Sequence, residues 1–391
     1  MRVLQVFNQQ RALEGGEEKS VRSRVAALES VGVDVDLYMV TSRGIEDSTL
    51  RKARAAASSF YSFSSYRRIM ERIEQFDPDV VEVHNIYPLV SPSVFAACRD
   101  AGVPSVFRVA SQILTCPTWY HMYDGHICER CLGGKEYWCV LQDCRDNLFE
   151  SALYAARNAF ARKSGLYRHV TLYIAISQFM SSRLQSIGID LERIAVVPNI
   201  VELPELFNGN DPGSYVAYAG RLSPEKGVSV LVSAARSLPQ IPFRIAGDGP
   251  ERPSLEAAAP SNVTFVGLLH GDDLSAFYRG ARAVAMPSVT YETAGMSALE
   301  ALGHGTPVIA SRIGALPEAV IEGTTGILVE PGHREDLARA IARIWSDPGQ
   351  AVALGAAGRN LVNENHSPRL AVTRVLYAYE AAIERYRSRS S

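Results

Sequence analysis

The chain has 391 residues, too many for a single compact core, so two domains of roughly 150 to 200 residues each are expected. Apolar residues make up 47% of it, with 29 glycines and 20 prolines, an ordinary composition for a globular protein. The 40 basic and 42 acidic residues give a net charge of −2, so no bulk charge favours nucleic acid as a partner.

The amino-terminal segment MRVLQVFNQQ turns polar after a few apolar residues, which is typical of a first strand rather than of a signal peptide. The sequence contains no uninterrupted apolar stretch long enough to cross a bilayer. We therefore expect a cytoplasmic protein.

The first half of the chain alternates short apolar runs with stretches of helical spacing. Such alternation predicts parallel strands joined by right-handed helical crossovers. The predicted strands are RVLQVF (2–7), VDVDLYMV (33–40), DVVEVH (79–84), PSVFRV (104–109), VTLYIAIS (170–177) and IAVVPN (194–199).

The same rhythm restarts after a segment, 199–214, that is rich in proline, asparagine and glycine and has the composition of a linker. Six further strands are predicted: YVAYAG (215–220), PFRIAG (242–247), NVTFVG (262–267), RAVAMPS (282–288), TPVIAS (306–311) and TGILVEP (325–331). The sequence thus predicts an α/β protein with two doubly wound, Rossmann-like domains, whose ligands bind at the carboxyl ends of the strands in a cleft between them.

We divide the chain into an amino-terminal domain, residues 1–198 with the final helical stretch 368–391, and a carboxyl-terminal domain, residues 199–367. The first domain is interrupted by a cysteine-rich insertion, residues 115–146.

Two cations follow the first strand of the carboxyl-terminal domain. In YAGRLSPEKG, Arg221 and Lys226 stand between the end of the strand and the next helix. A planar guanidinium and a mobile ammonium at this position suit a diphosphate. A pair of solvated surface charges is the alternative.

A second candidate site lies in YETAGMSALEALGHGTPVIAS, where a loop carboxylate, Glu292, precedes a helix that carries Glu300. The first helical turn offers the backbone amides of Gly295, Met296 and Ser297, which together with the helix dipole can hold a phosphate. The two glutamates can then accept hydrogen bonds from sugar hydroxyls at either end of one ligand. A helix cap with one surface acid is the simpler alternative.

These motifs occur in one order: EGGEEKSVR, VHN, VVPN, GRLSPEKG, IAGDGPE and YETAGMSALEALGHGTPVIAS. Together they resemble the retaining nucleotide-sugar glycosyltransferases of family four, which have the GT-B fold and a hallmark of two glutamates separated by seven residues. The resemblance extends over nearly the whole chain and includes a subset of the family with a similar cysteine segment.

The resemblance implies a role for each matched residue. Arg221 and Lys226 would bind the donor diphosphate, Glu300 the ribose and Glu292 the hydroxyls of the transferred sugar. His84 would contact that sugar near its reacting carbon. The glycines of the first loop, which are Gly15 and Gly16, would let its backbone approach the donor phosphates and the acceptor.

The implied reaction moves a sugar from a UDP- or GDP-sugar to a hydroxyl acceptor, with retention at the anomeric carbon and without a catalytic metal. The product would be a polysaccharide, a glycolipid or a small glycoside. A noncatalytic sugar-nucleotide-binding partner and a GT-B epimerase are the alternatives. In many relatives a His-Asp pair precedes the cysteine-proline, but here Ala110 and Ser111 occupy those positions, so the acceptor-handling role of that pair does not transfer.

Five of the six cysteines fall within the insertion. Cys128 and Cys131 have the Cys-x-x-Cys spacing of thiolate knuckles, and Cys116 and Cys144 flank them, which makes these four the candidate ligands of a structural zinc. Cys139, His121 and His126 are substitute ligands. Reduced, buried thiols are the alternative.

Residues 51–72 carry six basic side chains against one acid, with aromatic residues between them. Such a segment can rest on the inner face of an anionic membrane, where a lipid-linked acceptor would lie. An ordinary solvated pair of helices is the alternative reading, and binding of an acidic sugar acceptor is a third.

Overall fold

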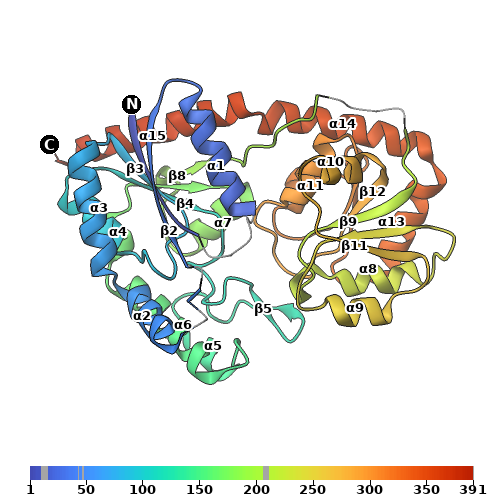
Figure 1. The fold of residues 1–391 in the computed structure, drawn as a ribbon, viewed down its shortest axis with the longest axis horizontal. Coiled ribbons are helices and arrows are strands. Elements are labelled where there is room, and N and C mark those ends of the chain that lie inside the picture. Colours follow the sequence, from blue (N-terminus) through green and yellow to red (C-terminus); the bar gives the residue numbers. More distant parts are fainter. Residues whose placement is uncertain (10–15, 43, 46–47, 206–210, 391) are drawn as a thin grey trace. The chain divides into compact units, whose positions relative to one another are not determined.

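The computed structural model describes residues 1–9, 16–42, 44–45, 48–205 and 211–390 (Figure 1). The chain forms two units. Unit 1 comprises residues 1–119, 129–200 and 369–391, and unit 2 comprises residues 120–128 and 201–368.

Unit 1 is built on a parallel six-stranded sheet in the order β2-β1-β3-β4-β7-β8. The strands are β1 (Arg2–Gln9), β2 (Asp34–Thr41), β3 (Val80–Val83), β4 (Ser105–Val109), β7 (Leu172–Ala175) and β8 (Ile194–Val196). Each overlaps one of the six apolar runs predicted for this half of the chain. The central strands β3, β4 and β7 are buried along their whole length, so they are mostly apolar rather than alternating, with Glu82 and Arg108 as the charged exceptions.

The helices of unit 1 are α1 (Gly16–Glu29), α2 (Thr49–Phe60), α3 (Phe63–Phe76), α4 (Ser93–Asp100), α5 (Tyr137–Leu141), α6 (Leu148–Lys163), α7 (Gln178–Ser186) and α15 (Pro368–Ser390), with short 3-10 turns at Leu166–His169 and Leu191–Arg193. Helix α15 returns from the end of the chain and packs Val372, Val375 and Tyr379 into the core around Val3 and Val80. This contact explains why the carboxyl terminus belongs to unit 1.

Unit 2 repeats the architecture with the parallel order β11-β10-β9-β12-β13-β14. Its strands are β9 (Tyr215–Ala219), β10 (Phe243–Ala246), β11 (Val263–Gly267), β12 (Ala281–Met286), β13 (Val308–Ser311) and β14 (Gly326–Val329). Its helices are α8 (Val228–Ala235), α9 (Arg252–Ala258), α10 (Gly271–Arg279), α11 (Met296–Gly303), α12 (Leu316–Ala319), α13 (Arg334–Ser346) and α14 (Pro348–His366), with a 3-10 turn at Pro224–Lys226. The predicted α/β class with two parallel sheets is confirmed.

Each sheet has a point at which the strand order reverses direction. In unit 2 the chain starts at β9, adds β10 and β11 on one side, and then returns to place β12 on the other side. In unit 1 it starts at β1, adds β2, and returns to place β3 beside β1. Ligands of doubly wound folds bind at the carboxyl ends of the strands next to such a point.

A small antiparallel hairpin, β5 (Met122–Tyr123) and β6 (His126–Ile127), forms within the cysteine-rich insertion. Although the insertion interrupts the sequence of unit 1, its residues 120–128 pack with unit 2. Among the helices of the described residues, none combines the length and the apolar character needed to cross a membrane.

Candidate functional site

The loop after β9 places Arg221 and Lys226 at the switch point of unit 2. The buried phenol of Tyr218 donates a hydrogen bond to the backbone carbonyl of Arg221 (2.8 Å). The amide of Val289, in the loop after β12, donates to the carbonyl of Glu225 (3.1 Å). These contacts hold the loops that follow the two adjacent strands together.

Lys226 and Glu292 form an ion pair across these loops. The ammonium of Lys226 lies 2.6 Å from Oε1 of Glu292, and the hydroxyl of Ser288 donates to the same oxygen at 2.7 Å. Burial alone would raise the pKa of the Glu292 carboxyl, but the Lys226 charge and the hydrogen bonds from Lys226 and Ser288 outweigh it and lower that pKa. Glu292 is therefore a carboxylate, able only to accept hydrogen bonds.

The turn after β13 fixes the backbone of Glu292. The amide of Ala315 donates to the Glu292 carbonyl at 2.8 Å. Gly314 has a φ of +59°, and a Cβ there would lie 2.3 Å from that same carbonyl oxygen. Only glycine permits this close approach, so Gly314 is required to hold the loop that carries Glu292 in its position.

Helix α11 begins directly after this loop. Its N-cap, Gly295, has a φ of +64°, and a Cβ at that position would lie 2.8 Å from the side chain of Leu316. Met296 and Ser297 occupy the first turn, as predicted for an amide cradle. One turn further on, Glu300 accepts a hydrogen bond from the hydroxyl of Tyr278 (3.2 Å).

The hairpin of the insertion contacts the same loops within unit 2. Nη1 of Arg221 donates to the hydroxyl of Tyr120 at 3.3 Å, and the hydroxyl of Thr290 donates to the backbone carbonyl of Tyr120 at 2.7 Å. The ring of His121 packs edge-on against Tyr291, with centroids 5.8 Å apart. The insertion therefore reaches the site through Tyr120.

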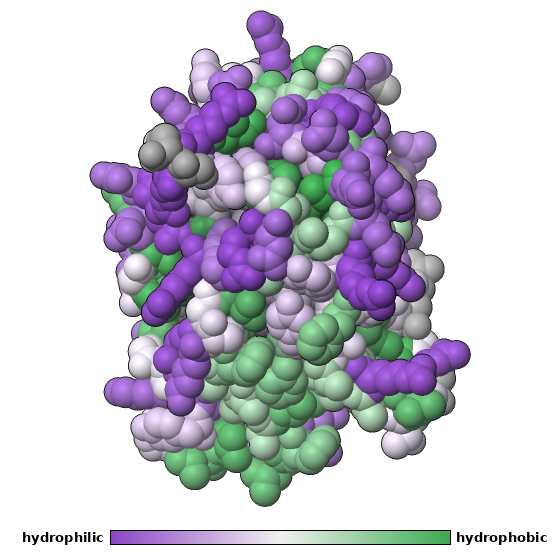
Figure 2. Space-filling view, turned by 90° about the vertical axis from the view of Figure 1, so that its left-hand side faces the viewer, coloured by the Kyte–Doolittle hydropathy of each residue, from purple (hydrophilic) through white to green (hydrophobic). Residues whose placement is uncertain are grey.

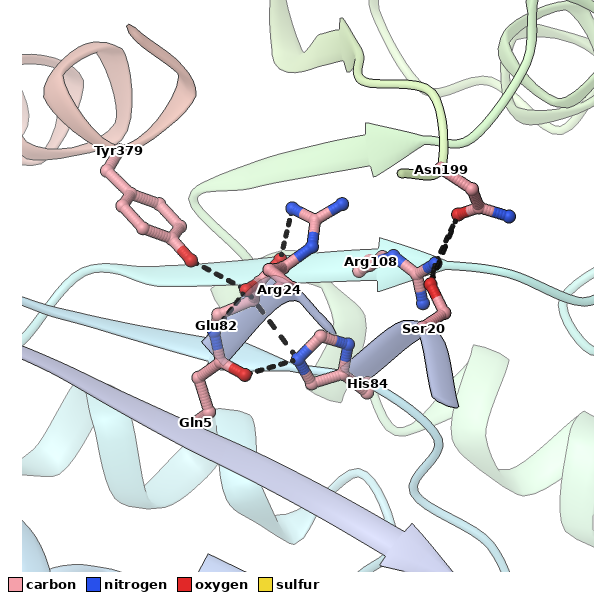
Figure 3. A network of polar contacts seen from close by, with 8 residues as sticks. All are labelled: Gln5, Ser20, Arg24, Glu82, His84, Arg108, Asn199 and Tyr379. Carbon is pink, nitrogen blue, oxygen red and sulfur yellow. Dashed lines mark hydrogen bonds and ion pairs between the residues drawn. The ribbon is translucent and has the colours of Figure 1, made fainter. Parts of the chain in front are cut away.

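In unit 1, His84 follows β3 at the switch point and belongs to a buried polar network (Figure 3). Glu82 accepts hydrogen bonds from Arg24 (3.2 Å), from the hydroxyl of Tyr379 (2.6 Å) and from the amide of Gln5 (3.0 Å). Nε2 of His84 lies 3.2 Å from Oε1 of Gln5. All five side chains are almost completely buried.

The environment sets the charges in this network. Burial would raise the pKa of the Glu82 carboxyl, but Arg24, His84, Tyr379 and Arg108 lower it further than burial raises it. Burial, only partly opposed by Glu82, lowers the pKa of His84 to about 3, so the imidazole is neutral at neutral pH. Burial raises the pKa of Tyr379 well above its usual value, and its hydroxyl is a donor.

The remaining predicted residue of this region, Gly16, begins α1, whereas Gly15 lies outside the described residues. A small pocket in unit 1 is lined by His84, Arg108 and both residues of the Ala110–Ser111 pair. The side chains that replace the usual His-Asp pair thus line the same pocket as His84.

Among the cysteines of the insertion, Cys139 lies in α5 and the other four lie outside helices and strands, and none forms a disulfide. A hydrogen bond to Cys144, burial, and the nearby Cys131 and Cys116 all raise the pKa of the Cys139 thiol, while the hydrogen bond from Cys139 lowers the pKa of Cys144. Across the described parts of the chain, however, no group of three or more His, Cys, Asp or Glu side chains is arranged to hold a metal ion. The zinc site stays a prediction, and the structure draws attention to Cys139, which sequence spacing had ranked only as a substitute.

Sequence reasoning missed the residues that support the site. Tyr218, Ser288 and Gly314 orient Arg221 and Glu292, and Tyr120 contacts Arg221 from the insertion. Tyr218 and Ser288 lie only three and four positions from their partners, but neither belongs to a recognised motif, and Tyr120 and Gly314 act through contacts with residues distant in sequence.

Two family models match the chain. The model described as Glycosyltransferase Family 4 matches residues 14–204, and the model described as Glycosyl transferases group 1 matches residues 213–347.

Curated relatives and solved structures agree with these matches. A D-inositol 3-phosphate glycosyltransferase of Pseudarthrobacter chlorophenolicus is 34% identical over 224 residues, 51% of this chain and 53% of the relative. The sulfoquinovosyl transferase SQD2 of Arabidopsis thaliana is 34% identical over 322 residues, 81% of this chain and 59% of the relative. The chain thus spans little more than half the length of these curated relatives.

The crystal structure of Anabaena Alr3699/HepE in complex with UDP superposes with a TM-score of 0.67, covering 97% of this chain and 100% of that one at 16% identity. At this identity the likeness bears on the fold alone. The two family matches, the two doubly wound units and this shared fold agree with one another: the chain has the GT-B fold and is similar to glycosyltransferases of family 4 and group 1.

Proposed function

We propose that the protein transfers a sugar from a nucleotide-sugar to a hydroxyl acceptor. The observation that carries this proposal is the Lys226–Glu292 ion pair, 2.6 Å long, at the carboxyl end of β9 and β12, directly before the amino terminus of α11. A cation, a carboxylate and a helix amino terminus converge at the strand-order switch point, where doubly wound folds bind their ligands.

The ion pair suits a ligand that has both phosphates and hydroxyls. A diphosphate would attract the Lys226 ammonium together with Arg221 and the first-turn amides of α11. Glu292, held as a carboxylate by Ser288 and by the charge beside it, would accept hydrogen bonds from the hydroxyls of the sugar. Glu300, a turn further along the helix, would accept from ribose.

The finer proposal is a retaining transfer from a UDP- or GDP-sugar. The bond between the anomeric carbon and the β-phosphate oxygen breaks, and the acceptor oxygen bonds to the same face of that carbon while its proton passes to the leaving diphosphate. Arg221, Lys226 and the helix amides would stabilise the charge that develops on the diphosphate, which is electrostatic preorganisation. Alr3699/HepE in its complex with UDP gives one precedent for the nucleotide within this fold.

The donor is tested by titrating the purified protein with UDP, GDP and ADP and with their hexose conjugates in a calorimeter, and by measuring release of free nucleotide with and without added acceptors. We expect one nucleotide to bind best and its sugar conjugate to be turned over. Tight binding without release in the presence of any acceptor would favour the noncatalytic sugar-binding alternative. Failure of every nucleotide to bind would overturn the proposal.

We also propose that unit 1 rests on an anionic membrane. Figure 2, in which the side of Figure 1 that carries α2 and α3 faces the viewer, shows hydrophobic side chains gathered at the lower end of this face, at the height of α2, α5 and α6. Leu141, Leu148 and Phe149 of α5 and α6 are 61–77% exposed. Helix α2, which packs against α6, carries the exposed basic residues Arg51, Lys52 and Arg54.

Part of the basic segment is occupied otherwise. Arg72 of α3 binds Asp36 through two contacts of 2.7 Å, and Tyr66 donates to Asp100. The basic residues of the segment that stay exposed are Arg51, Lys52 and Arg54 of α2 and Arg67 and Arg68 of α3. Sedimentation with vesicles containing anionic phospholipid should pull down the protein and should fail for Leu148→Ser/Phe149→Ser. Equal sedimentation with purely zwitterionic vesicles would contradict the proposal that the basic residues bind anionic headgroups.

The structural zinc is proposed as a staple of the insertion, with Cys116, Cys131 and Cys144 as ligands and with Cys128 or Cys139 as the fourth. Thiolates are the donors zinc prefers in structural sites. Elemental analysis of the protein purified without chelator should give one zinc per chain, and less than a tenth of an equivalent would contradict the proposal.

A further inference from the structure

Several groups in the buried network around Glu82 can only donate or only accept hydrogen bonds. Together they determine which nitrogen of His84 carries the proton. Glu82 is paired with Arg24 at 3.2 Å, with side-chain exposures of 0% and 2%. A buried carboxylate beside a guanidinium is ionised, and an ionised carboxylate can only accept hydrogen bonds. The assignment of every neighbour starts from this fact.

The next link is Gln5, which lies between Glu82 and His84 (Figure 3). Because Glu82 donates nothing, the group of Gln5 that faces it at 3.0 Å must be the amide nitrogen. The carbonyl oxygen of Gln5 then faces Nε2 of His84 at 3.2 Å. A carbonyl also only accepts, so Nε2 must carry the proton, and the 3.6 Å separation between Nε2 and Glu82 Oε2 favours the same assignment.

A neutral imidazole has one proton, so Nδ1 is left with a bare lone pair. Figure 3 shows this nitrogen on the side of the ring away from Gln5. It is buried and has no hydrogen-bond partner among the residues that the structure describes. His84 lines a small pocket of unit 1.

Arg108 of β4 lines the same pocket and supplies the opposite kind of group. Its Nη2 donates to the hydroxyl of Ser20 (2.8 Å) and to the side-chain oxygen of Asn199. Its Nη1 and Nε are buried and, within the described part of the chain, lack an acceptor. One acceptor on His84 and donors on Arg108 therefore border one pocket.

We propose that Gln5 and Glu82 are positioning residues that hold His84 in the Nε2–H tautomer, so that its Nδ1 accepts a hydrogen bond from a substrate hydroxyl whose oxygen accepts from Arg108. A hydroxyl both donates and accepts, so it satisfies both groups. A carboxylate or a phosphate offers only acceptors, which would suit Arg108 but would set a lone pair against the lone pair of Nδ1. The two groups therefore fit a hydroxyl rather than an anion, and the proposed function supplies a sugar as the molecule that carries it.

The inference rests on the proposed function only in taking the hydroxyl to be that of a sugar, since the tautomer follows from the network itself. It also gives each member of the network a role. Arg24 keeps Glu82 ionised, Glu82 orients the amide of Gln5, and Gln5 orients the ring of His84. Without the charged carboxylate the amide of Gln5 could turn over, and both tautomers of His84 would become accessible.

The tautomer is measured directly by nitrogen-15 NMR of the imidazole rings in histidine-labelled protein, with the signals of His84 assigned by their absence in His84→Gln. We expect an unprotonated Nδ1 and a protonated Nε2 in the wild-type protein. Gln5→Met should shift both signals toward the average of the two tautomers. Tyr379→Phe, which removes a donor from Glu82 but leaves Gln5 in place, is the matched control and should keep the wild-type pattern. A protonated Nδ1 in the wild-type protein would overturn the assignment without any variant.

The ligand class is tested on the same signals with probes of two kinds. Saturating glucose or myo-inositol should move the Nδ1 signal in the direction of an accepted hydrogen bond, and Gln5→Met should weaken the apparent affinity for the same probe about tenfold. Sodium acetate and sodium sulfate at equal concentration should leave the signal unmoved. Movement by the anions alone, or by no hydroxyl probe, would overturn the hydroxyl assignment. Failure of the proposed transferase activity would instead appear as absent nucleotide release while the tautomer and the probe response remain.

Discussion

Each unit has an ion pair next to the point at which its strand order reverses, but the two pairs lie in opposite surroundings. In unit 2, Lys226 and Glu292 are 28% and 12% exposed. In unit 1, Arg24 and Glu82 are 2% and 0% exposed. Both pairs link the segment after the first strand of the sheet to the strand, or the end of the strand, placed beside it.

The difference in exposure separates two uses of charge. A partly exposed pair can exchange one partner for a ligand, because the charge left behind can be resolvated or paired with the ligand. A fully buried pair cannot open without stranding a charge in a medium of low polarity, so it organises its neighbours instead. The difference agrees with the proposal that the pair of unit 2 binds the ligand, and it gives the pair of unit 1 a structural part.

The largest expected effect is on activity in unit 2. Lys226→Ala and Glu292→Ala should each lower kcat/KM for nucleotide-sugar turnover by at least about a hundredfold, the scale of removing one preorganised charge-stabilising group. Because the pair is partly exposed, the free energy of unfolding should change by only about 1 kcal/mol. Nucleotide release and urea unfolding measure the two quantities. Wild-type turnover in either variant would contradict the proposal that this pair binds the ligand.

The converse pattern is expected in unit 1, where stability should suffer first. Arg24→Met should lower the free energy of unfolding by about 3–5 kcal/mol, because it leaves Glu82 buried and unpaired. The matched control is Arg22→Met on the same helix, whose pair with Glu18 involves a guanidinium that is 52% exposed, and its cost should be within about 0.5 kcal/mol. Equal losses for the two variants would show that burial is not what distinguishes the pairs.

A smaller effect is expected from the insertion. Tyr120→Phe removes the hydroxyl that accepts from Arg221, so KM for the donor should rise about two- to tenfold with little change in stability. Tyr123→Phe, a substitution of the same type at a 41% exposed position of the same hairpin, is the control. An unchanged KM in Tyr120→Phe would restrict the role of the insertion to structure.

The smallest effect is a change in the pH dependence of stability. The pKa of His84 is lowered from its ordinary value of 6.5 to about 3 in the folded protein, so between these pH values the unfolded chain binds a proton that the folded protein does not. The free energy of unfolding should therefore fall as the pH falls from 6.5 toward 3. The slope should be shallower in His84→Gln and unchanged in a substitution of the exposed His126, as measured by urea unfolding at several pH values. His169 and His304, whose pKa values are also lowered, contribute equally to all three proteins.

Much of the fold was predictable because parallel strands buried on both faces leave a local signal. All twelve predicted strands of the two sheets are present, with boundaries within a few residues of those expected. The donor-site candidates Arg221, Lys226, Gly295 and Glu300 were found by the same reasoning, since loops after such strands and the first turn of the following helix bind ligands.

Several of the supporting contacts were not predictable, since they join residues far apart in sequence. Tyr379 reaches Glu82 across 297 positions, and Arg221 reaches Tyr120 across 101. The sequence division also kept the whole insertion in the amino-terminal domain, whereas residues 120–128 pack with unit 2. No local pattern encodes either pairing.

The sequence by itself therefore determined the two parallel sheets, their loops and the residue types that stand after each strand, because hydrophobic periodicity and turn chemistry act between near neighbours in the chain. Only the tertiary structure decided which charged side chains remain partly exposed, so that a ligand can reach them, and which are fully buried. Exposure and hydrogen-bond direction depend on what the rest of the chain packs around a group, and that packing gives Glu292 and Glu82, two carboxylates of the same kind, their different exposures and partners.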